Sequence, residues 1–345
     1  MIAFLKNTFR RPYHHIRHYV APQGPKDFDS ETLPLVDKDV SLEQVIDKVQ
    51  IEGSLPFDLK EKLAFWRENG FVVLENVLPT QWLDNLWNEV EETIENHEKY
   101  DMTALVYQFN NTKDAKLKDI PKDKLKSIGA RINDYHNASI GAKKVMTHPN
   151  IVAFLRAVLD NDLTAFQSLI FKYSSQQSTH QDYPWVTSGV PSHLAAAWIP
   201  LEDVHPDSGP LFYYPGSHKL PKFHFGVTGI LYKHGLSLFS PDQFGKYLDK
   251  ICATFGIQKK VLLIKKGDIL IWHGALAHGG SRINNAEMTR KSFVCHYSTV
   301  QAQPKHRAET KDVSQTSYYN GVAIYANPAN LAQEDIISQG KDWTE

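Results

Sequence analysis

The sequence has few cysteines and no long apolar run, and each absence excludes a class of protein. Two cysteines, Cys252 and Cys295, cannot build a disulfide framework, so we expect a reducing, cytoplasmic environment. A transmembrane segment needs about 18 consecutive apolar residues, and the sequence contains no such run. The 38 basic and 39 acidic residues nearly cancel. The protein therefore lacks a global field that would attract nucleic acid or an anionic membrane, and we expect no nucleic-acid partner.

Several catalytic motifs are absent as well. No glycine-rich phosphate loop leads into a helix, and neither G-x-S-x-G nor C-x-x-C occurs. The basic start of the chain, residues 1–20, has too short an apolar stretch for a secretory signal. We expect it to be a solvated arm or a short helix, with its histidines His14, His15 and His18 exposed.

Helical and strand patterns divide the chain into three parts. Residues 1–55 are a polar arm and lead-in with one short helix, residues 56–300 form a single domain, and residues 301–345 form a tail that packs on the core. At the front of the domain, apolar residues recur at helical spacing. They predict helices over 57–70, 80–100 and 148–159, and a strand over 71–78.

After residue 160 short strands with turn residues dominate the pattern. They are predicted over 164–173, 192–202, 209–216, 260–267, 268–280 and 290–300, with one helix over 240–255. Strands that follow a helical segment favour a mainly β fold with flanking helices. We expect a double-stranded β-helix, a jelly roll of the cupin-like kind.

The triplet His180-Gln181-Asp182 raises the question of a metal site. In a strand, residues two apart point to the same face, so His180 and Asp182 can reach one ion. On its own the triplet is better explained as a polar loop, because His-x-Asp occurs often by chance. A third ligand elsewhere in the chain would decide between the two.

His278 is the best candidate for that third ligand. It ends an apolar stretch and precedes a Gly-Gly turn, and Arg290 begins the next predicted strand. Two imidazoles and one carboxylate suit non-haem Fe(II) and leave positions open for a 2-oxo acid and O₂. An arginine can grip the far carboxylate of 2-oxoglutarate through its planar fork.

These motifs, in this order, resemble the phytanoyl-CoA dioxygenase family of Fe(II)/2-oxoglutarate-dependent oxygenases. The resemblance runs from Leu59 to Ser298. It rests on the front segment "FWRENGFVVLENVLPTQWLDNLWNEVEE", the triplet "HQD", the segment "AAAWIPLEDVHPDSGPLFYYPGSH" and the segment "KKGDILIWHGALAHGGSRINNAEMTRKSFVCHY". The family has a double-stranded β-helix core, which agrees with the strand pattern.

The resemblance implies a role for individual residues. His180, Asp182 and His278 match the iron ligands, and Arg290 matches the 2-oxoglutarate anchor, with Arg282 as a weaker rival. Trp198 matches a tryptophan that lines the cosubstrate pocket. Gln167, in the strand before the triplet, either donates its amide to cosubstrate or substrate or is an ordinary strand residue.

The remaining histidines have other expected places. We interpret His218 as structural, His273 as a core residue on the same strand as His278 but on its opposite face, and His296 as buried and hydrogen-bonded. His193 and His205 are less favoured candidates for substrate contact. Lys259, Lys260, Lys265 and Lys266 are expected on a solvated strand edge.

The sequence thus predicts an Fe(II)- and 2-oxoglutarate-dependent dioxygenase that uses O₂, hydroxylates a small organic or lipid-like molecule, and releases succinate and CO₂. Alternatives are desaturation, cyclisation or epimerisation at the same centre, or an inert cupin-like ligand-binding protein. Asp182 disfavours halogenation, because related halogenases lack the carboxylate ligand. Neither the substrate nor the oligomeric state can be derived from the sequence. We expect substrate selectivity to reside in the front helices, in residues 219–258 and in the tail.

Overall fold

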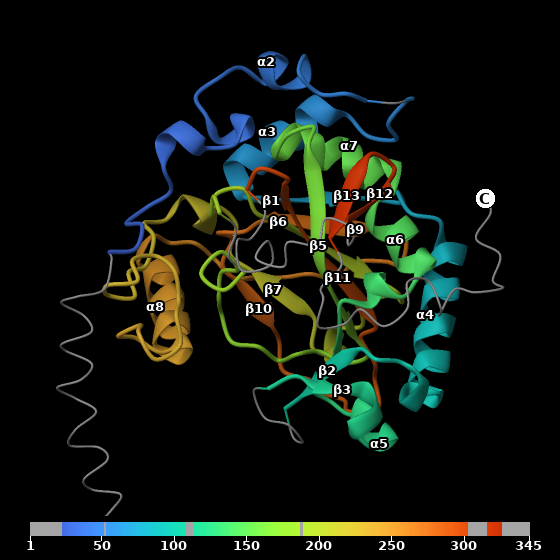
Figure 1. The fold of residues 1–345 in the computed structure, drawn as a ribbon. Coiled ribbons are helices and arrows are strands. Elements are labelled where there is room, and N and C mark those ends of the chain that lie inside the picture. The colour runs from blue at the N-terminus through green and yellow to red at the C-terminus, as the bar shows by residue number, and fades with distance from the viewer. Residues whose placement is uncertain (1–22, 52, 108–112, 187–188, 303–315, 326–345) are drawn as a thin grey trace, which may run out of the picture.

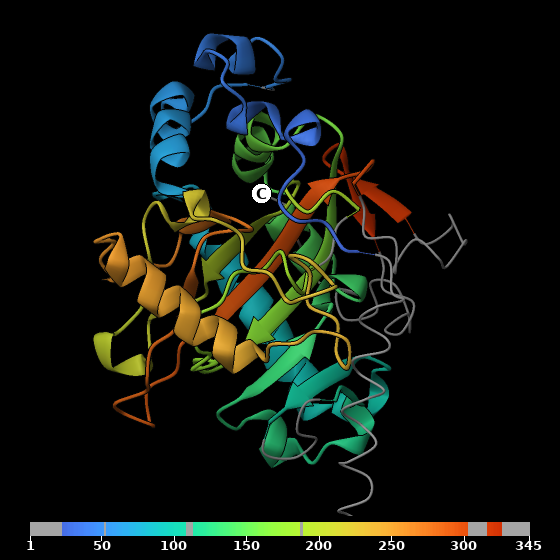
Figure 2. The same cartoon turned by 90° about the vertical axis from the view of Figure 1, so that its left-hand side faces the viewer.

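A computed structural model describes residues 23–51, 53–107, 113–186, 189–302 and 316–325. Strands fill the centre of the molecule and helices cover it from opposite sides (Figure 1). In Figure 1, α8 (Pro241–Thr254) lies at the left, whereas α4 (Thr80–Glu95) and α6 (Ile140–Met146) lie at the right. The view turned by 90° brings α8 to the front (Figure 2).

The described strands form two sheets. The larger has ten strands: β1 (Phe71–Leu74), β9 (Ile269–His273), β6 (Ala195–Pro200), β11 (Ser292–Thr299), β5 (Leu163–Phe171), β4 (Ala130–Asn133), β2 (Thr103–Val106) and β3 (Ala115–Lys116) in spatial order, with β12 (Thr316–Tyr319) and β13 (Val322–Tyr325) attached through β5. The smaller has the order β10 (His278–Gly280), β7 (Leu211–Tyr213) and β8 (Lys260–Val261). Most pairs are antiparallel, and β13 joins β5 in parallel. The expected mainly β, double-stranded β-helix fold is confirmed.

Strand alternation gives the larger sheet two apolar faces. On its outer face, residues such as Ile199, Ile271 and Phe293 pack against Trp66 and Phe154 of the front helices. On its inner face, Trp198 and Trp272 share a cluster with Leu211 and Tyr213 of the smaller sheet. The functional pocket opens between these two inner faces.

Helices close both outer sides of this sandwich. The described α-helices are α2 (Leu42–Ile46), α3 (Leu59–Asn69), α4, α5 (Lys122–Leu125), α6, α7 (Pro149–Val158) and α8. The 3₁₀ turns are η1 (Ser30–Thr32), η2 (Leu35–Asp37), η3 (His97–Lys99), η4 (Leu117–Asp119), η5 (Tyr135–Asn137), η6 (Pro206–Ser208) and η7 (Ser217–Lys219). Phe244 and Leu248 of α8 pack on Phe212 of the smaller sheet, so this helix covers the side opposite to α3 and α7.

Local sequence explains where these helices begin and end. The Asp58 side chain accepts from the Glu61 N–H at the start of α3, and Gly70 ends that helix with a positive φ of 74°. Ser240 and Gln243 form a reciprocal capping box at the start of α8. The predicted helices at 57–70, 80–100, 148–159 and 240–255 and the strand at 71–78 are confirmed, with shorter ends.

Two strand predictions are wrong in part. The stretch 268–280, predicted as one strand, is β9 and β10 in different sheets, joined by a turn at 274–277. Only Lys260–Val261 of the predicted strand 260–267 forms a strand. The region 101–147, where the pattern predicted nothing, adds β2, β3 and β4 to the larger sheet and α6 to its outer side. The N-terminal histidines lie outside the described residues.

Candidate metal centre and its pocket

Backbone pairing brings His180 and His278 together from distant parts of the chain. Each residue's N–H donates to the other's carbonyl oxygen at 2.9 Å, which makes an isolated antiparallel bridge. Close approach around Gly279 supports this pairing. A Cβ atom at Gly279 would lie 2.7 Å from the Gln177 carbonyl oxygen and 2.5 Å from the Phe212 ring. A glycine after His278 is therefore required for the two segments to meet.

Asp182 is held by the turn that separates β9 from β10. The backbone N–H groups of Asp182 and Tyr183 both donate to the Gly274 carbonyl oxygen, at 2.9 and 3.1 Å. Asp182 itself is in a bend rather than a strand, so the expected strand geometry of the triplet is limited to the bridge at His180. The two side chains still converge, because the turn redirects the chain toward the same point.

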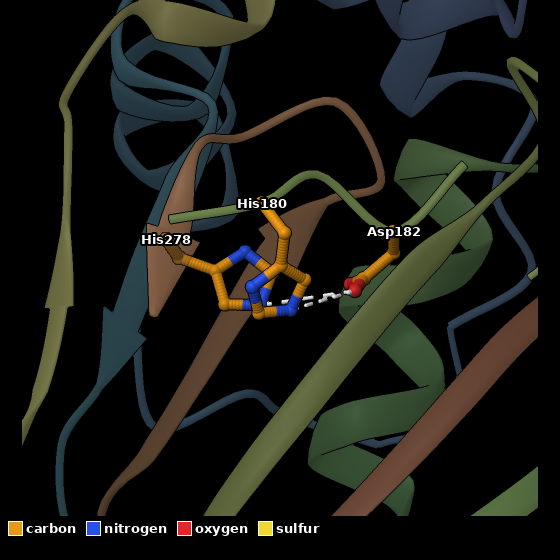
Figure 3. Close-up of side chains that lie close together, drawn as sticks. All are labelled: His180, Asp182 and His278. Carbon is orange, nitrogen blue, oxygen red and sulfur yellow. Dashed lines mark ion pairs between the residues drawn. The ribbon is translucent and has the colours of Figure 1, made fainter. Parts of the chain in front are cut away.

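The three side chains meet over a small volume. His180 Nε2 lies 3.6 Å and His278 Nε2 lies 3.7 Å from Asp182 Oδ1. The ligand atoms all lie within 4.8 Å of one another, which is a geometry that can hold a metal ion. Figure 3 shows both imidazoles pointing at the carboxylate from one side. Within the described residues, this is the only such group of three.

The outer nitrogens of the imidazoles determine their tautomers. His180 Nδ1 donates to the Ser178 carbonyl oxygen at 2.9 Å, and His278 Nδ1 donates to the Leu276 carbonyl oxygen at 3.0 Å. A carbonyl oxygen can only accept, so each Nδ1 carries a proton and Nε2 is the nitrogen of each ring that can bind a metal at the centre. Burial, followed by the charge of His278, lowers the pKa of His180 to about 4, so this imidazole is neutral at pH 7.

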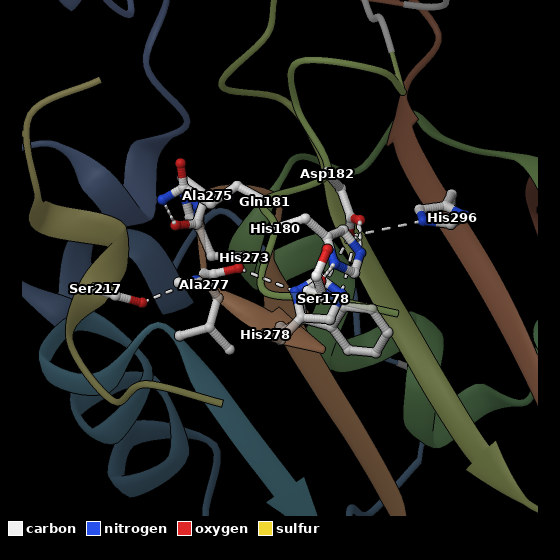
Figure 4. Close-up of polar contacts among 12 residues, drawn as sticks. Ser178, His180, Gln181, Asp182, Ser217, His273, Ala275, Ala277, His278 and His296 are labelled. Carbon is white, nitrogen blue, oxygen red and sulfur yellow. Dashed lines mark hydrogen bonds and ion pairs between the residues drawn. The ribbon is translucent and has the colours of Figure 1, made fainter. Parts of the chain in front are cut away.

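The Asp182 carboxylate is ionised and oriented by its neighbours. Burial by itself raises its pKa, but His278 and His296 outweigh that effect and hold the pKa well below its ordinary value. Trp272 Nε1 donates to Oδ2 at 2.9 Å, and His296 Nε2 lies 3.7 Å from the same oxygen. Figure 4 shows His296 approaching Asp182 from the side away from the other two histidines. Oδ1 therefore remains directed at the two Nε2 atoms.

Arg290 lies further along the pocket and has no acidic partner among the described residues. It is 4 % exposed, its Nη1 donates to the Gly209 carbonyl oxygen at 2.8 Å, and its buried Nε has no hydrogen-bond partner. Its guanidinium stacks 5.5 Å from the ring centre of Trp198. Burial lowers the pKa of Arg290 to about 10, so the group stays charged at pH 7. A buried cation with a free donor is a ready site for a carboxylate.

A cavity of about 370 Å³ joins these features. The three candidate ligands, Arg290, Trp198, Gln167 and His296 all line it. From residues 219–258, where selectivity was expected, only Pro241 reaches the cavity. Two lining residues, Trp272 and Arg131, were not singled out from the sequence. Nothing in the predicted strand that contains Trp272 indicates a contact with Asp182. Arg131 lies in the region 101–147, where the sequence pattern predicted no element.

The other histidines lie away from the cavity lining. His193 bonds to Thr299 and the Thr32 carbonyl, and His205 is exposed beside Asp207. His273 is buried as expected, but it ends β9 instead of sharing a strand with His278. Its Nε2 lies 3.3 Å from Asp37 Oδ2. Arg282, the weaker rival for the anchor, is exposed and does not line the cavity.

Comparison with known proteins identifies the class and then the family. The sequence model described as phytanoyl-CoA dioxygenase (PhyH) matches residues 66–292, about two thirds of the 345-residue chain. The chain therefore belongs to the phytanoyl-CoA dioxygenase family and is a non-haem iron, 2-oxoglutarate-dependent dioxygenase that uses O₂.

Individual relatives are distant. The chain is 22% identical to human peroxisomal phytanoyl-CoA dioxygenase over 291 residues, which is 80% of this chain and 78% of the relative. It is 26% identical over 275 residues to a Caenorhabditis elegans phytanoyl-CoA dioxygenase domain-containing protein 1 homolog, covering 70% of this chain and 90% of the relative.

Solved structures share the fold. EctD from S. alaskensis with bound Fe superposes with a TM-score of 0.54 at 15% identity, covering 91% of this chain and 94% of EctD. The epimerase SnoN from nogalamycin biosynthesis superposes with a TM-score of 0.53 at 18% identity, covering 80% and 95%. Within the described residues, no helix combines the length and apolar character needed to cross a bilayer.

Proposed function

We propose that the protein hydroxylates a small organic or lipid-like substrate and couples this to oxidative decarboxylation of 2-oxoglutarate, releasing succinate and CO₂. The observation that carries the proposal is the convergence of two imidazole Nε2 atoms and one carboxylate oxygen beside a buried arginine that has no acidic partner among the described residues. Two imidazoles and one carboxylate form the donor set typical of non-haem Fe(II) oxygenases, and three donors leave positions open on the metal.

His180, Asp182 and His278 would hold the iron. Bound iron supplies the activation of O₂, which no side chain can supply. The protein's part is to keep three donors fixed and oriented. Backbone carbonyl oxygens accept from both Nδ1 atoms, and the Trp272 N–H donates to Asp182 Oδ2. These hydrogen bonds orient the three donors in the absence of the metal.

Arg290 and Trp198 would hold the far end of 2-oxoglutarate. The Arg290 guanidinium has a free Nε donor for a carboxylate, and its planar fork suits bidentate binding. The Trp198 ring lies beside the guanidinium, with its centre 5.5 Å from the guanidinium carbon. Burial of both side chains excludes water from this end of the cavity. Gln167 also lines the cavity, so its amide is available to cosubstrate or substrate.

The proposal includes the domain organisation, the location and the partners of the protein. We take residues 56–300 as the oxygenase domain, preceded by the lead-in 1–55 and followed by the tail 301–345, part of which pairs with β5 through β13. The two cysteines of the chain are buried and free, which fits a cytoplasmic location. A cavity of about 370 Å³ suits a small molecule rather than a nucleic acid.

A substrate-independent measurement tests this function. Anaerobic addition of Fe(II) and 2-oxoglutarate should produce the visible charge-transfer band of the chelate, and admission of oxygen should release succinate. His278→Ala should lose both signals, whereas His205→Ala, an exposed histidine outside the cavity, should keep them. A wild-type protein that gives neither band nor succinate would instead be an inert ligand-binding protein. Once a substrate is found, the mass of its product separates hydroxylation from desaturation, cyclisation and epimerisation.

A further inference from the structure

Arg131 is a second arginine in the same cavity, and it comes from a different strand. It lies in β4, where it pairs with Phe171 of β5, and Phe171 pairs in turn with Ser292 of β11. Partners in an antiparallel register point to the same face. Arg131 therefore shares the inner face with Phe171, and both line the cavity.

No described residue neutralises Arg131. Among the described residues it has no ion pair, and its Nε is buried without a hydrogen-bond partner. Of the described residues that line the cavity, Asp182 is the sole acidic one, and its oxygens face the histidines and Trp272. Within the part of the chain that the structure describes, the cavity thus contains two arginines whose buried Nε atoms have no partner, Arg131 and Arg290. Each Nε is a vacant donor for an anion, because a buried N–H without a hydrogen-bond partner is costly. The Arg131 side chain as a whole is half-buried, whereas Arg290 is fully buried.

The two arginines serve different regions of the cavity. Arg290 precedes β11 and stacks on Trp198 of β6, whereas β5 separates β11 from β4. Two strand spacings place the backbones of β11 and β4 about 10 Å apart. A 2-oxoglutarate molecule that spans the metal centre and Arg290 runs along β6 and β11, which leaves the inner face of β5 and β4 for a second molecule.

That second region begins at the polar Gln167, continues along apolar side chains and ends at a cation. Gln167, Leu169 and Phe171 follow each other on the inner face of β5, and the Gln167 position lies opposite His296, next to Asp182. From Gln167 to Phe171 the strand covers about 13 Å, and Arg131 stands beside Phe171. Trp185 and Val186 also line the cavity. A molecule lying here would have an apolar body near the metal centre and an anionic group at Arg131.

We propose that Arg131 binds an anionic group, a carboxylate or a phosphate, on the primary substrate. The substrate is accordingly an extended amphiphilic acid, which reacts at a position remote from its charged end. The assignment of which end reacts rests on the proposed function, whereas the anion site itself does not. Arg131 is a specificity-determining residue in this assignment and takes no part in holding iron or 2-oxoglutarate.

The test compares an acid with a neutral molecule of the same chain length. Octanoate, octyl phosphate and 1-octanol are titrated calorimetrically into anaerobic protein loaded with Fe(II) and 2-oxoglutarate. The proteins are wild type, Arg131→Gln, Arg131→Lys and Arg282→Ala, the last being an exposed arginine outside the cavity. 2-Oxoglutarate affinity is followed in parallel through the charge-transfer band, and thermal melting checks that each variant is folded.

We expect the wild type to bind at least one of the two acids about ten-fold or more tightly than octanol. Arg131→Gln should lose about 30-fold of the affinity for that acid while its octanol and 2-oxoglutarate affinities change by less than about two-fold. Arg131→Lys should recover part of the loss, and Arg282→Ala should match wild type. The acid that binds more tightly identifies the anionic group as carboxylate or phosphate.

Two results would overturn the proposal. The first is that wild type binds both acids no more tightly than octanol. The second is that Arg131→Gln weakens 2-oxoglutarate as strongly as Arg290→Ala does, which would make Arg131 a cosubstrate clamp. Failure of the proposed function has a separate signature, since a protein without the charge-transfer band but with an Arg131-dependent preference for acids would retain the anion site.

Discussion

The indole of Trp272 donates a hydrogen bond of 2.9 Å to Asp182 Oδ2 and so leaves Oδ1 for the two histidines. Trp272 comes from β9 and Asp182 from the bend after the His180 bridge, 90 residues apart in the chain. A carboxylate rotates easily, and one oxygen that is tied to a buried donor cannot exchange places with the other. This contact thereby defines which Asp182 oxygen faces the centre.

Removing the Trp272 donor should weaken iron binding without removing a ligand. Trp272→Phe keeps most of the ring volume and deletes the N–H, so the Asp182 carboxylate gains freedom. We expect Fe(II) affinity to fall by about 10- to 100-fold, the usual effect of losing such a support. Anaerobic Fe(II) titration measures this, with Trp87→Phe as control because that indole N–H donates to Glu91 on α4 and Trp87 is not among the residues that line the cavity. Equal iron affinity in wild type and Trp272→Phe would show that Asp182 is held by its backbone alone.

Each of the three candidate ligands should be indispensable. Alanine at His180, Asp182 or His278 should abolish iron-dependent succinate release and leave the melting temperature of the metal-free protein close to that of wild type, because the backbone pairing is unaffected. His205→Ala is the matched control. If His278→Ala kept wild-type turnover with added Fe(II), the metal assignment would be wrong.

Arg290 should determine the affinity for 2-oxoglutarate. Truncating one partner of a desolvated, bidentate arginine–carboxylate pair costs about 2 to 5 kcal/mol, so Arg290→Ala should weaken 2-oxoglutarate binding by about 30-fold or more. Arg290→Lys should restore only part of this, because an ammonium lacks the planar fork. Iron affinity should hardly change.

Titration of 2-oxoglutarate into anaerobic Fe(II)-loaded protein, followed through the charge-transfer band, measures the 2-oxoglutarate affinity directly. Arg282→Ala is the control. If Arg282→Ala lost the cosubstrate and Arg290→Ala did not, the anchor would be Arg282. If neither mattered, 2-oxoglutarate would not bind as proposed.

Gly279→Ala should disrupt the bridge between His180 and His278. The new Cβ would lie 2.7 Å from a backbone oxygen, which cannot move as a flexible side chain can. We expect a lower unfolding free energy and weaker iron binding together. Gly235→Ala is a useful comparison, because its φ of 77° carries strain of about 1 kcal/mol while nothing lies within 4 Å of the new Cβ. If Gly279→Ala bound iron as tightly as wild type, the close approach of the His180 and His278 segments would not be needed for metal binding.

His218 should make stability depend on pH. Burial, with the charge of His273 as a smaller effect, lowers the pKa of His218 to about 3 in the folded protein, below the ordinary value of about 6.5 for an unfolded chain. The unfolded state therefore binds the proton more readily. The stability that this neutral imidazole contributes is complete above pH 6.5 and is lost progressively as the pH falls from about 6.5 toward 3.

Urea unfolding at several pH values between 7.5 and 4.5 measures this loss. His218→Phe retains a ring against Gly70 but cannot titrate, so its unfolding free energy should fall less steeply than that of wild type. His205→Ala should follow the wild-type curve. Parallel curves for wild type and His218→Phe would assign the acid sensitivity to other groups.

Local sequence was enough to locate the front helices, most of the strands and the candidate ligands. Helices α3 and α8 are bounded by capping residues that act on the nearest few backbone groups, so their ends are visible in the chain. His180, Asp182, His278 and Arg290 could be selected because their chemistry is rare in combination. The structure brings the first three together and places the fourth in the same cavity.

Tertiary structure alone decided what surrounds them. His273 and His278 stand five residues apart, yet a turn puts them in different sheets, and nothing local distinguishes that turn from a continuous apolar strand. Trp272 and His296 meet Asp182 only because β9 and β11 lie on either side of β6. Arg131 enters the cavity through a chain of strand registers from β11 to β5 to β4. A strand register pairs residues that are far apart in the sequence. A short window of sequence contains only one of the two partners, so these contacts cannot be derived from it.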